Sequence, residues 1–174
     1  MNREFFVVLV KPKKKFVPFS WIIRLFQGWT KYSHCAFEFS ISNHRMFYEA
    51  KQPEVSLRNE YFFKKQYEVI KRYKITVSEE KYRDIRDMVM LYSGSPYPVL
   101  ENIALAFSKW LRLENNFYSD DKFMKCSELL ANFLNKLFDQ KINSEMVDVK
   151  DIENYLDFLA QQLESNVLLV ELNQ

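Results

Sequence analysis

Polar and apolar residues alternate along three segments of the chain, at 33–41, 45–51 and 67–77. Successive side chains of a β-strand point to opposite faces of a sheet, so this alternation is typical of strands with one buried face. The first two segments are nearly contiguous, and we predict that they form a β-hairpin that turns near Ser42 and Asn43. These segments constrain the fold most, because they require a sheet with antiparallel neighbours.

The other segments predict an α+β domain in which helices pack against a central antiparallel sheet. The continuous apolar run at 4–10 is typical of a buried strand, and 166–172 is a further candidate strand. Apolar residues at helical spacing predict helices at about 20–29, 78–92, 99–113, 126–137 and 148–163. The chain has two glycines and scattered prolines, so we find no linker and expect a single domain over residues 1–174.

The charge balance argues against several classes of partner. A net charge of +2, from 25 basic and 23 acidic residues, is too small to attract nucleic acid over the whole surface. No apolar stretch reaches the roughly 18 residues that span a bilayer, and the first ten residues resemble a strand more than a signal peptide. We therefore expect a cytoplasmic protein. The lysine-rich segment 11–15 beside the helix at 20–29 leaves contact with a membrane surface open, although a core helix is the preferred interpretation.

Two cysteines, Cys35 and Cys126, and two histidines, His34 and His44, are the candidate reactive groups. They lack the CxxC and HxxxH spacings that are typical of metal sites, so we expect neither a metal nor another cofactor. His34 and Cys35 are adjacent in the sequence, but on a strand they point to opposite faces. We therefore predict that Cys35 packs into the core. His44 falls in the predicted turn, where we expect a surface histidine.

The register of the hairpin decides which carboxylate can meet His34. We favour the pairing of His34 with Glu49, because this register also sets Glu38 opposite Arg45. It requires a tight turn of unfavourable sequence at 41–42, so an offset of two residues, which leaves Glu49 diagonal to His34, stays open. Glu38 is about 13 Å from His34 along the same strand, too far for a hydrogen bond.

Cys126 is the better candidate for a nucleophile. It begins the apolar stripe of the most regular helix, just after the polar segment 118–122. A helix N-terminus lowers the pKa of a thiol through the helix dipole, and a nearby histidine accepts the proton. Spacing alone leaves open the alternative that Cys126 is a small core residue and His34 a structural histidine.

Three segments resemble the circularly permuted papain-like amidases, the YiiX-type branch of the NlpC superfamily. They are FSWIIRLFQGWTKYSHCAFEF (19–39), MFYEA (46–50) and FMKCSELLANFL (123–134). In that family a Ser-His strand comes first, then an acidic residue followed by alanine, and then a Cys-Ser-Glu-Leu helix. The resemblance extends over about residues 4–139 and implies a permuted papain-like, NlpC-type fold.

This resemblance implies a role for each candidate residue. Cys126 would be the nucleophile, His34 the general base and Glu49 the group that orients the imidazole, with the backbone N–H of Cys126 in the oxyanion hole. Tyr32 and Tyr97 are candidates for contact with the substrate. The implied activity is thiol-dependent hydrolysis of an amide or ester bond, through an acyl-enzyme, in a small-molecule, peptide or lipid-like substrate.

Two alternatives to this hydrolase stay open. An acyltransferase of the related lecithin:retinol acyltransferase type would pass the same acyl group to an acceptor instead of water. An acidic third residue favours the hydrolase over this type. A noncatalytic binding or virion-associated module would keep the fold and lack the chemistry, and its Cys126 would have an ordinary or raised thiol pKa.

Overall fold

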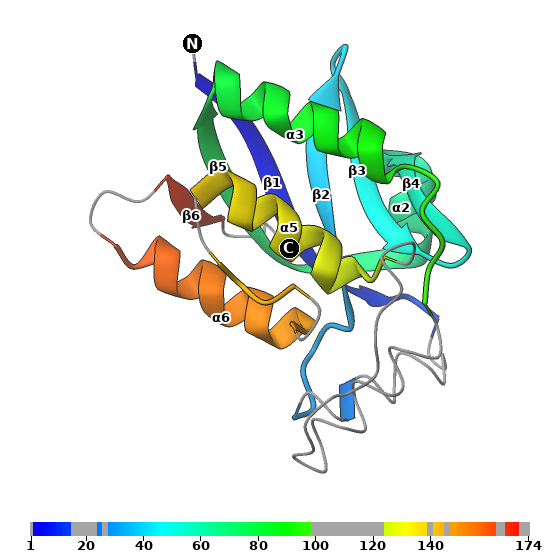
Figure 1. Ribbon diagram of the computed structural model, residues 1–174. Coiled ribbons are helices and arrows are strands. Elements are labelled where there is room, and N and C mark those ends of the chain that lie inside the picture. The colour runs from blue at the N-terminus through cyan, green and yellow to red at the C-terminus, as the bar shows by residue number, and fades with distance from the viewer. Residues whose placement is uncertain are drawn as a thin grey trace.

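A computed structural model describes residues 2–14, 24–25, 28–98, 124–138, 141–144, 147–162 and 166–170 of the protein. Its centre is a six-stranded sheet in which every pair of neighbouring strands is antiparallel, in the order β4-β3-β2-β1-β5-β6 (Figure 1). The strands are β1 (Asn2–Pro12), β2 (His34–Ile41), β3 (His44–Lys51), β4 (Glu54–Asn59), β5 (Tyr67–Ser78) and β6 (Val167–Val170). The predicted α+β fold class with a central antiparallel sheet is confirmed.

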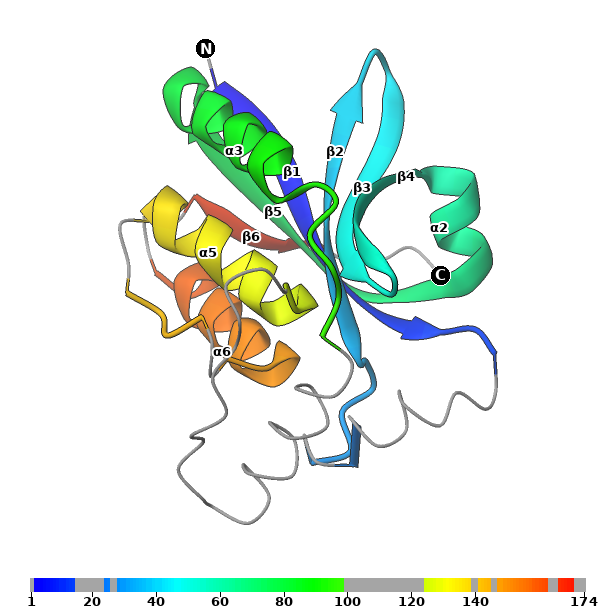
Figure 2. The same ribbon diagram turned by 45° about the vertical axis from the view of Figure 1, so that its right-hand side comes forward.

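Helices cover both faces of the sheet unequally. Among the described helices, α3 (Glu79–Tyr92), α5 (Cys126–Phe138) and α6 (Val149–Ala160) lie on one face, and the short α2 (Glu60–Gln66) lies on the other (Figure 2). None of the described helices is long and apolar enough to cross a membrane.

The strand β1 is buried on both faces, as its continuous apolar run predicts. Val7 and Leu9 belong to the large core cluster beneath α3, α5 and α6, whereas Val8 and Val10 belong to a smaller cluster with Phe63 of α2. All four valine and leucine side chains are fully buried. Because alternate residues face alternate sides, a strand between two helical layers must be apolar throughout.

The turn between β2 and β3 corrects the favoured hairpin register. The strands pair Phe37 with Tyr48 and Phe39 with Met46, which is an offset of two residues from the pairing of His34 with Glu49. Ser42 and Asn43 form the turn with φ angles of 47° and 65°. A two-residue hairpin turn with both residues in the left-handed region matches the twist of the strands, so the turn determines the register here.

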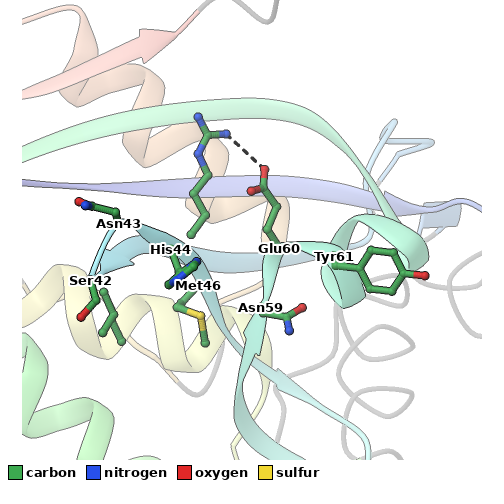
Figure 3. A pocket seen from close by; sticks show the side chains of 9 residues that line it. Ser42, Asn43, His44, Met46, Asn59, Glu60 and Tyr61 are labelled. Carbon is green, nitrogen blue, oxygen red and sulfur yellow. Dashed lines mark hydrogen bonds and ion pairs between the residues drawn. The ribbon is translucent and has the colours of Figure 1, made fainter.

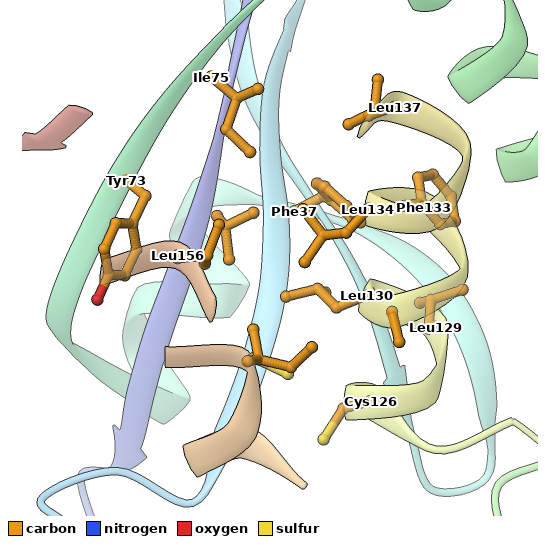
Figure 4. Close-up of a cluster of buried hydrophobic side chains, with 14 of the residues drawn as sticks. Phe37, Tyr73, Ile75, Cys126, Leu129, Leu130, Phe133, Leu134, Leu137 and Leu156 are labelled. Carbon is orange, nitrogen blue, oxygen red and sulfur yellow. The ribbon is translucent and has the colours of Figure 1, made fainter. Parts of the chain in front are cut away.

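Helix α5 holds Cys126 against the sheet through a row of buried side chains (Figure 4). Leu130 and Leu134 are completely buried, and the ring of Phe133 lies 4.5 Å from that of Phe37 on β2. Truncation of a core leucine to alanine typically costs about 2–5 kcal/mol. The position of Cys126 relative to β2 is therefore determined by core packing.

The predicted starts of two helices, at Ser78 and Asp148, are confirmed by their caps. Ser78 caps α3 by accepting a hydrogen bond from the backbone N–H of Lys81, and Asp148 caps α6 in a capping box with Asp151. Neither β4 nor α2 was predicted from the sequence. The predicted helix at 99–113 and most of that at 20–29, including its proposed membrane contact, lie outside the described residues.

Candidate active site

Cys126 is the first residue of α5, and its side chain is almost completely buried. Figure 4 shows its sulfur at the end of the helix, directed to the side on which the strands lie. The Glu128 carboxylate accepts a hydrogen bond from the backbone N–H of Lys125, and the Ser127 hydroxyl donates to the Val147 carbonyl at 2.8 Å. These bonds hold the first turn of α5 in place, where the positive end of the helix dipole favours a thiolate.

His34 is the first residue of β2, and it connects Cys126 to a buried carboxylate. Its Nε2 lies 2.6 Å from Oε2 of Glu49, and Cys126 is near enough to raise the pKa of the imidazole. Since Nε2 is occupied by Glu49, Nδ1 is the nitrogen left for the sulfur. Tyr67 stacks on the imidazole, with ring centroids 5.1 Å apart and planes at 24°, and this contact restricts rotation of the ring.

Glu49 reaches His34 diagonally across the hairpin. Continuing the observed register by one residue from the pair Phe37 and Tyr48 sets Glu49 opposite Ala36, two residues from His34 on the same face. The Glu49 side chain is completely buried. The contact follows the diagonal alternative and not the favoured direct pairing.

The charges of this row shift the acid–base properties of both reactive groups. The neighbouring Cys35 thiol lowers the pKa of Cys126 well below its ordinary value; burial opposes this shift, and the charge of His34 adds to it. Burial alone would lower the pKa of His34, but the charges of Cys126 and Glu49 raise it to about 9. Both shifts favour a thiolate beside an imidazolium over the neutral pair.

Cys35 contributes more to the site than the strand period predicts. It is fully buried in the cluster that also contains Phe37, as expected for a core residue. It also lies near enough to Cys126 to affect the pKa of that thiol, and burial raises the pKa of Cys35 itself well above the ordinary value. No local pattern indicates this contact, because it depends on how α5 packs against β2.

The two tyrosines predicted to contact substrate lie in different surroundings. The hydroxyl of Tyr32, a buried residue, donates a hydrogen bond to Glu153 of α6. Tyr97 is half-buried and packs against the large core cluster; burial and the nearby charges of Cys126 and Glu49 raise its pKa. Tyr97 is thus close to the reactive groups, whereas the Tyr32 hydroxyl is held by α6. Their substrate contacts stay predictions.

An open hollow at the hairpin turn does not contain the reactive groups. Figure 3 shows it, lined by the turn residues, by His44 and Met46, and by the start of α2. Arg45 and Glu60 form an ion pair across it, with 3.5 Å between Nη1 and Oε1. His34 lies at the opposite end of β2 from this turn, so the hollow and the Cys126 site are separate.

Comparison with known proteins gives a similar fold. No protein-family model matches the chain, and no curated protein does. A solved structure described as "Crystal structure of metalloprotein yiiX from Escherichia coli O157:H7, DUF1105" is similar, with a TM-score of 0.56 at 10% sequence identity. The alignment covers 98% of this chain and 97% of that chain. The fold is YiiX-like. At this identity the likeness concerns the fold alone.

Proposed function

We propose that the protein is a thiol-dependent hydrolase that cleaves an amide or ester bond through an acyl-enzyme on Cys126. The observation that carries this proposal is the contact row of Cys126, His34 and Glu49, with the sulfur at a helix N-terminus and the carboxylate 2.6 Å from the imidazole. A nucleophile, a base and an orienting group that lie next to one another are the arrangement that acyl transfer needs.

The first half of the reaction forms a thioester. The Cys126 thiolate attacks the carbonyl carbon, and the carbonyl oxygen becomes negative while the carbon is tetrahedral. The backbone N–H of Cys126, unpaired within the first turn of a helix, can donate to that oxygen. When the tetrahedral intermediate collapses, the bond to the leaving nitrogen or oxygen breaks, and the His34 imidazolium gives that atom its proton.

The second half returns the enzyme to its starting state. The neutral imidazole of His34 takes a proton from water, and the resulting hydroxide attacks the thioester carbon. The carbon–sulfur bond then breaks, so the products are a carboxylic acid and the Cys126 thiolate beside a protonated His34. Glu49 keeps the ring in the orientation that serves both transfers.

No step of this proposal involves a metal ion. The word metalloprotein belongs to the description of the similar structure. Within the ranges that the structure describes, no group of three or more His, Cys, Asp or Glu side chains could hold a metal ion. The residues around Cys126 therefore do not fit a metal site, and they are assigned here to acid–base and nucleophilic roles.

The first test is the pH dependence of iodoacetamide labelling, measured separately at Cys126 and Cys35 by mass spectrometry. We expect Cys126 to label rapidly below the ordinary thiol pKa of about 8.5, and Cys35, as an internal control, to label slowly. His34→Ala should slow labelling of Cys126 at neutral pH. A slow Cys126 that is indifferent to His34 in the folded protein would support a noncatalytic binding module instead.

The second test identifies the acceptor of the acyl group. A panel of activated esters and anilides is offered to the wild-type protein and to Cys126→Ala, with and without added amine or alcohol, and the products are identified by mass spectrometry. We expect the free acid as the main product. A dominant amide or ester of the added acceptor would assign the protein to the acyltransferases.

A further inference from the structure

Glu49 has a second charged partner on the side away from His34. Arg58 lies on β4, two residues beyond Ser56, which pairs directly with Glu49 on β3. Its Nε is 2.8 Å from Oε1 of Glu49, while Oε2 of the same carboxylate meets His34. Each oxygen of Glu49 therefore has one cationic neighbour, and the two neighbours come from strands on either side of β3.

Because the Glu49 carboxylate is buried, it needs a second cationic partner. The Glu49 side chain is completely buried, and that of Arg58 is 25% exposed. Removing a carboxylate from water costs several kcal/mol unless opposite charges compensate it. His34 shares its positive charge between Glu49 and the Cys126 thiolate, so Arg58 supplies the charge that is otherwise missing.

Four groups thus form a row of alternating charge. In order they are the Cys126 thiolate, the His34 imidazolium, the Glu49 carboxylate and the Arg58 guanidinium, and their sum is zero. A buried site with no net charge keeps its thiolate more readily than one with an excess negative charge. Without Arg58 the row would have an excess negative charge, and the Cys126 thiolate would be protonated at a higher pH than in the wild type.

We propose that Arg58 is a positioning residue of the site, which holds and neutralises Glu49 so that Glu49 can orient His34 toward Cys126. This inference rests on the proposed hydrolase function. The Nε of Arg58 and the Oε1 of Glu49 are close but are not aligned as a hydrogen bond, so the contact is an ion pair. The positive charge of Arg58 therefore matters more than the shape of its guanidinium.

Other titratable groups near the row do not replace Arg58. Lys51 is on the same strand as Glu49, but its amine donates to Gln66 and lies 5.2 Å from the centre of the Tyr67 ring. Burial lowers the pKa of Lys51, and Arg58 adds to that effect while Glu49 opposes it. Burial raises the pKa values of Cys35, Tyr67 and Tyr97, which keeps all three neutral at the pH values of interest.

The test compares the pH midpoint of Cys126 labelling by iodoacetamide in matched variants. Arg58→Gln removes the charge, Arg58→Met removes it while keeping the aliphatic packing, and Arg58→Lys keeps it. Arg72→Gln is the control, because it breaks another partly buried pair, in which Arg72 meets Glu38 through two hydrogen bonds of 2.9 and 2.6 Å. Circular dichroism and urea unfolding check that each variant is folded.

We expect both uncharged variants of Arg58 to raise the labelling midpoint by about one pH unit. Below both midpoints, labelling would then be about tenfold slower than in the wild type. Arg58→Lys and Arg72→Gln should stay close to the wild-type midpoint.

Three results would overturn the inference, and they differ in what they say of the proposed function. If the wild-type midpoint depends on His34 but Arg58→Gln does not change it, Arg58 serves packing alone and the hydrolase proposal stands. If Cys126 in the wild type labels slowly with an ordinary midpoint, both proposals fail together. An equal rise in Arg72→Gln would also count against a specific role for Arg58.

Discussion

Two carboxylates of this protein are buried among similar partners, one in the Cys126 site and one on α6. Glu49 meets His34 and Arg58, whereas Glu153 accepts hydrogen bonds from Tyr32 and Lys150 and forms an ion pair of 2.7 Å with Lys71. We call the second group the α6 cluster; it also contains Tyr73 and Asp157, which are hydrogen-bonded at 2.6 Å.

The two regions differ in the side-chain group at the end of each row of contacts. In the Cys126 site the row ends at a thiol at a helix N-terminus, and its partners lower the pKa of that thiol. In the α6 cluster the row ends at hydroxyls whose pKa values burial raises, as for Tyr32 and Tyr73. A buried carboxylate with charged partners is thus compatible with a purely structural role, and the thiol at the helix N-terminus distinguishes the candidate active site.

Removing the nucleophile should separate the two regions most clearly. Cys126→Ala should lower turnover of the activated ester p-nitrophenyl acetate by about a thousandfold or more, to the background rate, because the acyl-enzyme cannot form. Glu153→Gln should leave turnover within about threefold of the wild type, since Glu153 does not contact the reactive groups. Comparable losses in both variants would show that the α6 cluster takes part in the reaction.

Removing the orienting carboxylate should have the next largest effect. Glu49→Gln keeps the shape of the side chain and should lower turnover about a hundredfold, because the imidazole loses its charged anchor. Glu49 raises the pKa of His34, which is about 9, so its neutralisation should move the alkaline limit of activity to lower pH. This direction is opposite to that expected for Arg58→Gln.

The measurement for Glu49→Gln is a pH–rate profile from pH 5 to 10 with the same ester, with Glu38→Gln as the matched control. Glu38 is also buried beside an arginine on this sheet, but it does not contact His34. A profile for Glu49→Gln that keeps its alkaline limit would contradict the assignment of Glu49 as the partner of His34.

Much of this site could be predicted from the sequence because its parts follow local patterns. The amphipathic stripe that begins at Cys126 locates a helix N-terminus, and alternation separates His34 from Cys35. The predicted hairpin register, favoured because it sets Glu38 opposite Arg45, was wrong by two residues. The turn at 42–43 determines the register, and Glu38 forms an ion pair with Arg72 of β5 instead.

The remaining features depend on tertiary contacts that no local pattern indicates. Arg58 was missed because β4 is only six residues long, and its alternation rests on two apolar residues alone, Val55 and Leu57. The proximity of Cys35 and Cys126 brings together a strand and a helix far apart in the chain. Both contacts become visible only once the order of strands and the packing of α5 are known.

The α6 cluster should contribute to stability where the Cys126 site contributes to reactivity. Burial would raise the pKa of Glu153, but Lys150, Lys71 and Tyr32 outweigh it and lower that pKa. Glu153→Gln should therefore reduce the free energy of unfolding by about 2 kcal/mol. A group whose pKa falls on folding stabilises the protein above its unfolded pKa, about 4.3 for glutamate, and loses that contribution as the pH falls through its folded pKa.

Urea unfolding of the wild type and Glu153→Gln at several pH values tests this expectation. The difference in unfolding free energy should be constant above about pH 5 and should shrink as the pH falls below about 4.3. Glu68→Gln is the control, since the pair of Glu68 with Lys11 is exposed and should contribute less than about 0.5 kcal/mol. A difference that grows toward low pH would contradict a lowered pKa of Glu153 in the folded protein.

The smallest effect concerns Cys35, which lies beside Cys126 in the large core cluster. A thiol is a weak hydrogen-bond donor, so Cys35→Ala should raise the labelling midpoint of Cys126 by only about half a pH unit. Cys35→Ser keeps a donor at nearly the same position and should stay near the wild-type midpoint. If serine and alanine shift the midpoint equally, Cys35 acts through packing, and the low thiol pKa must then come from His34 and the helix N-terminus alone.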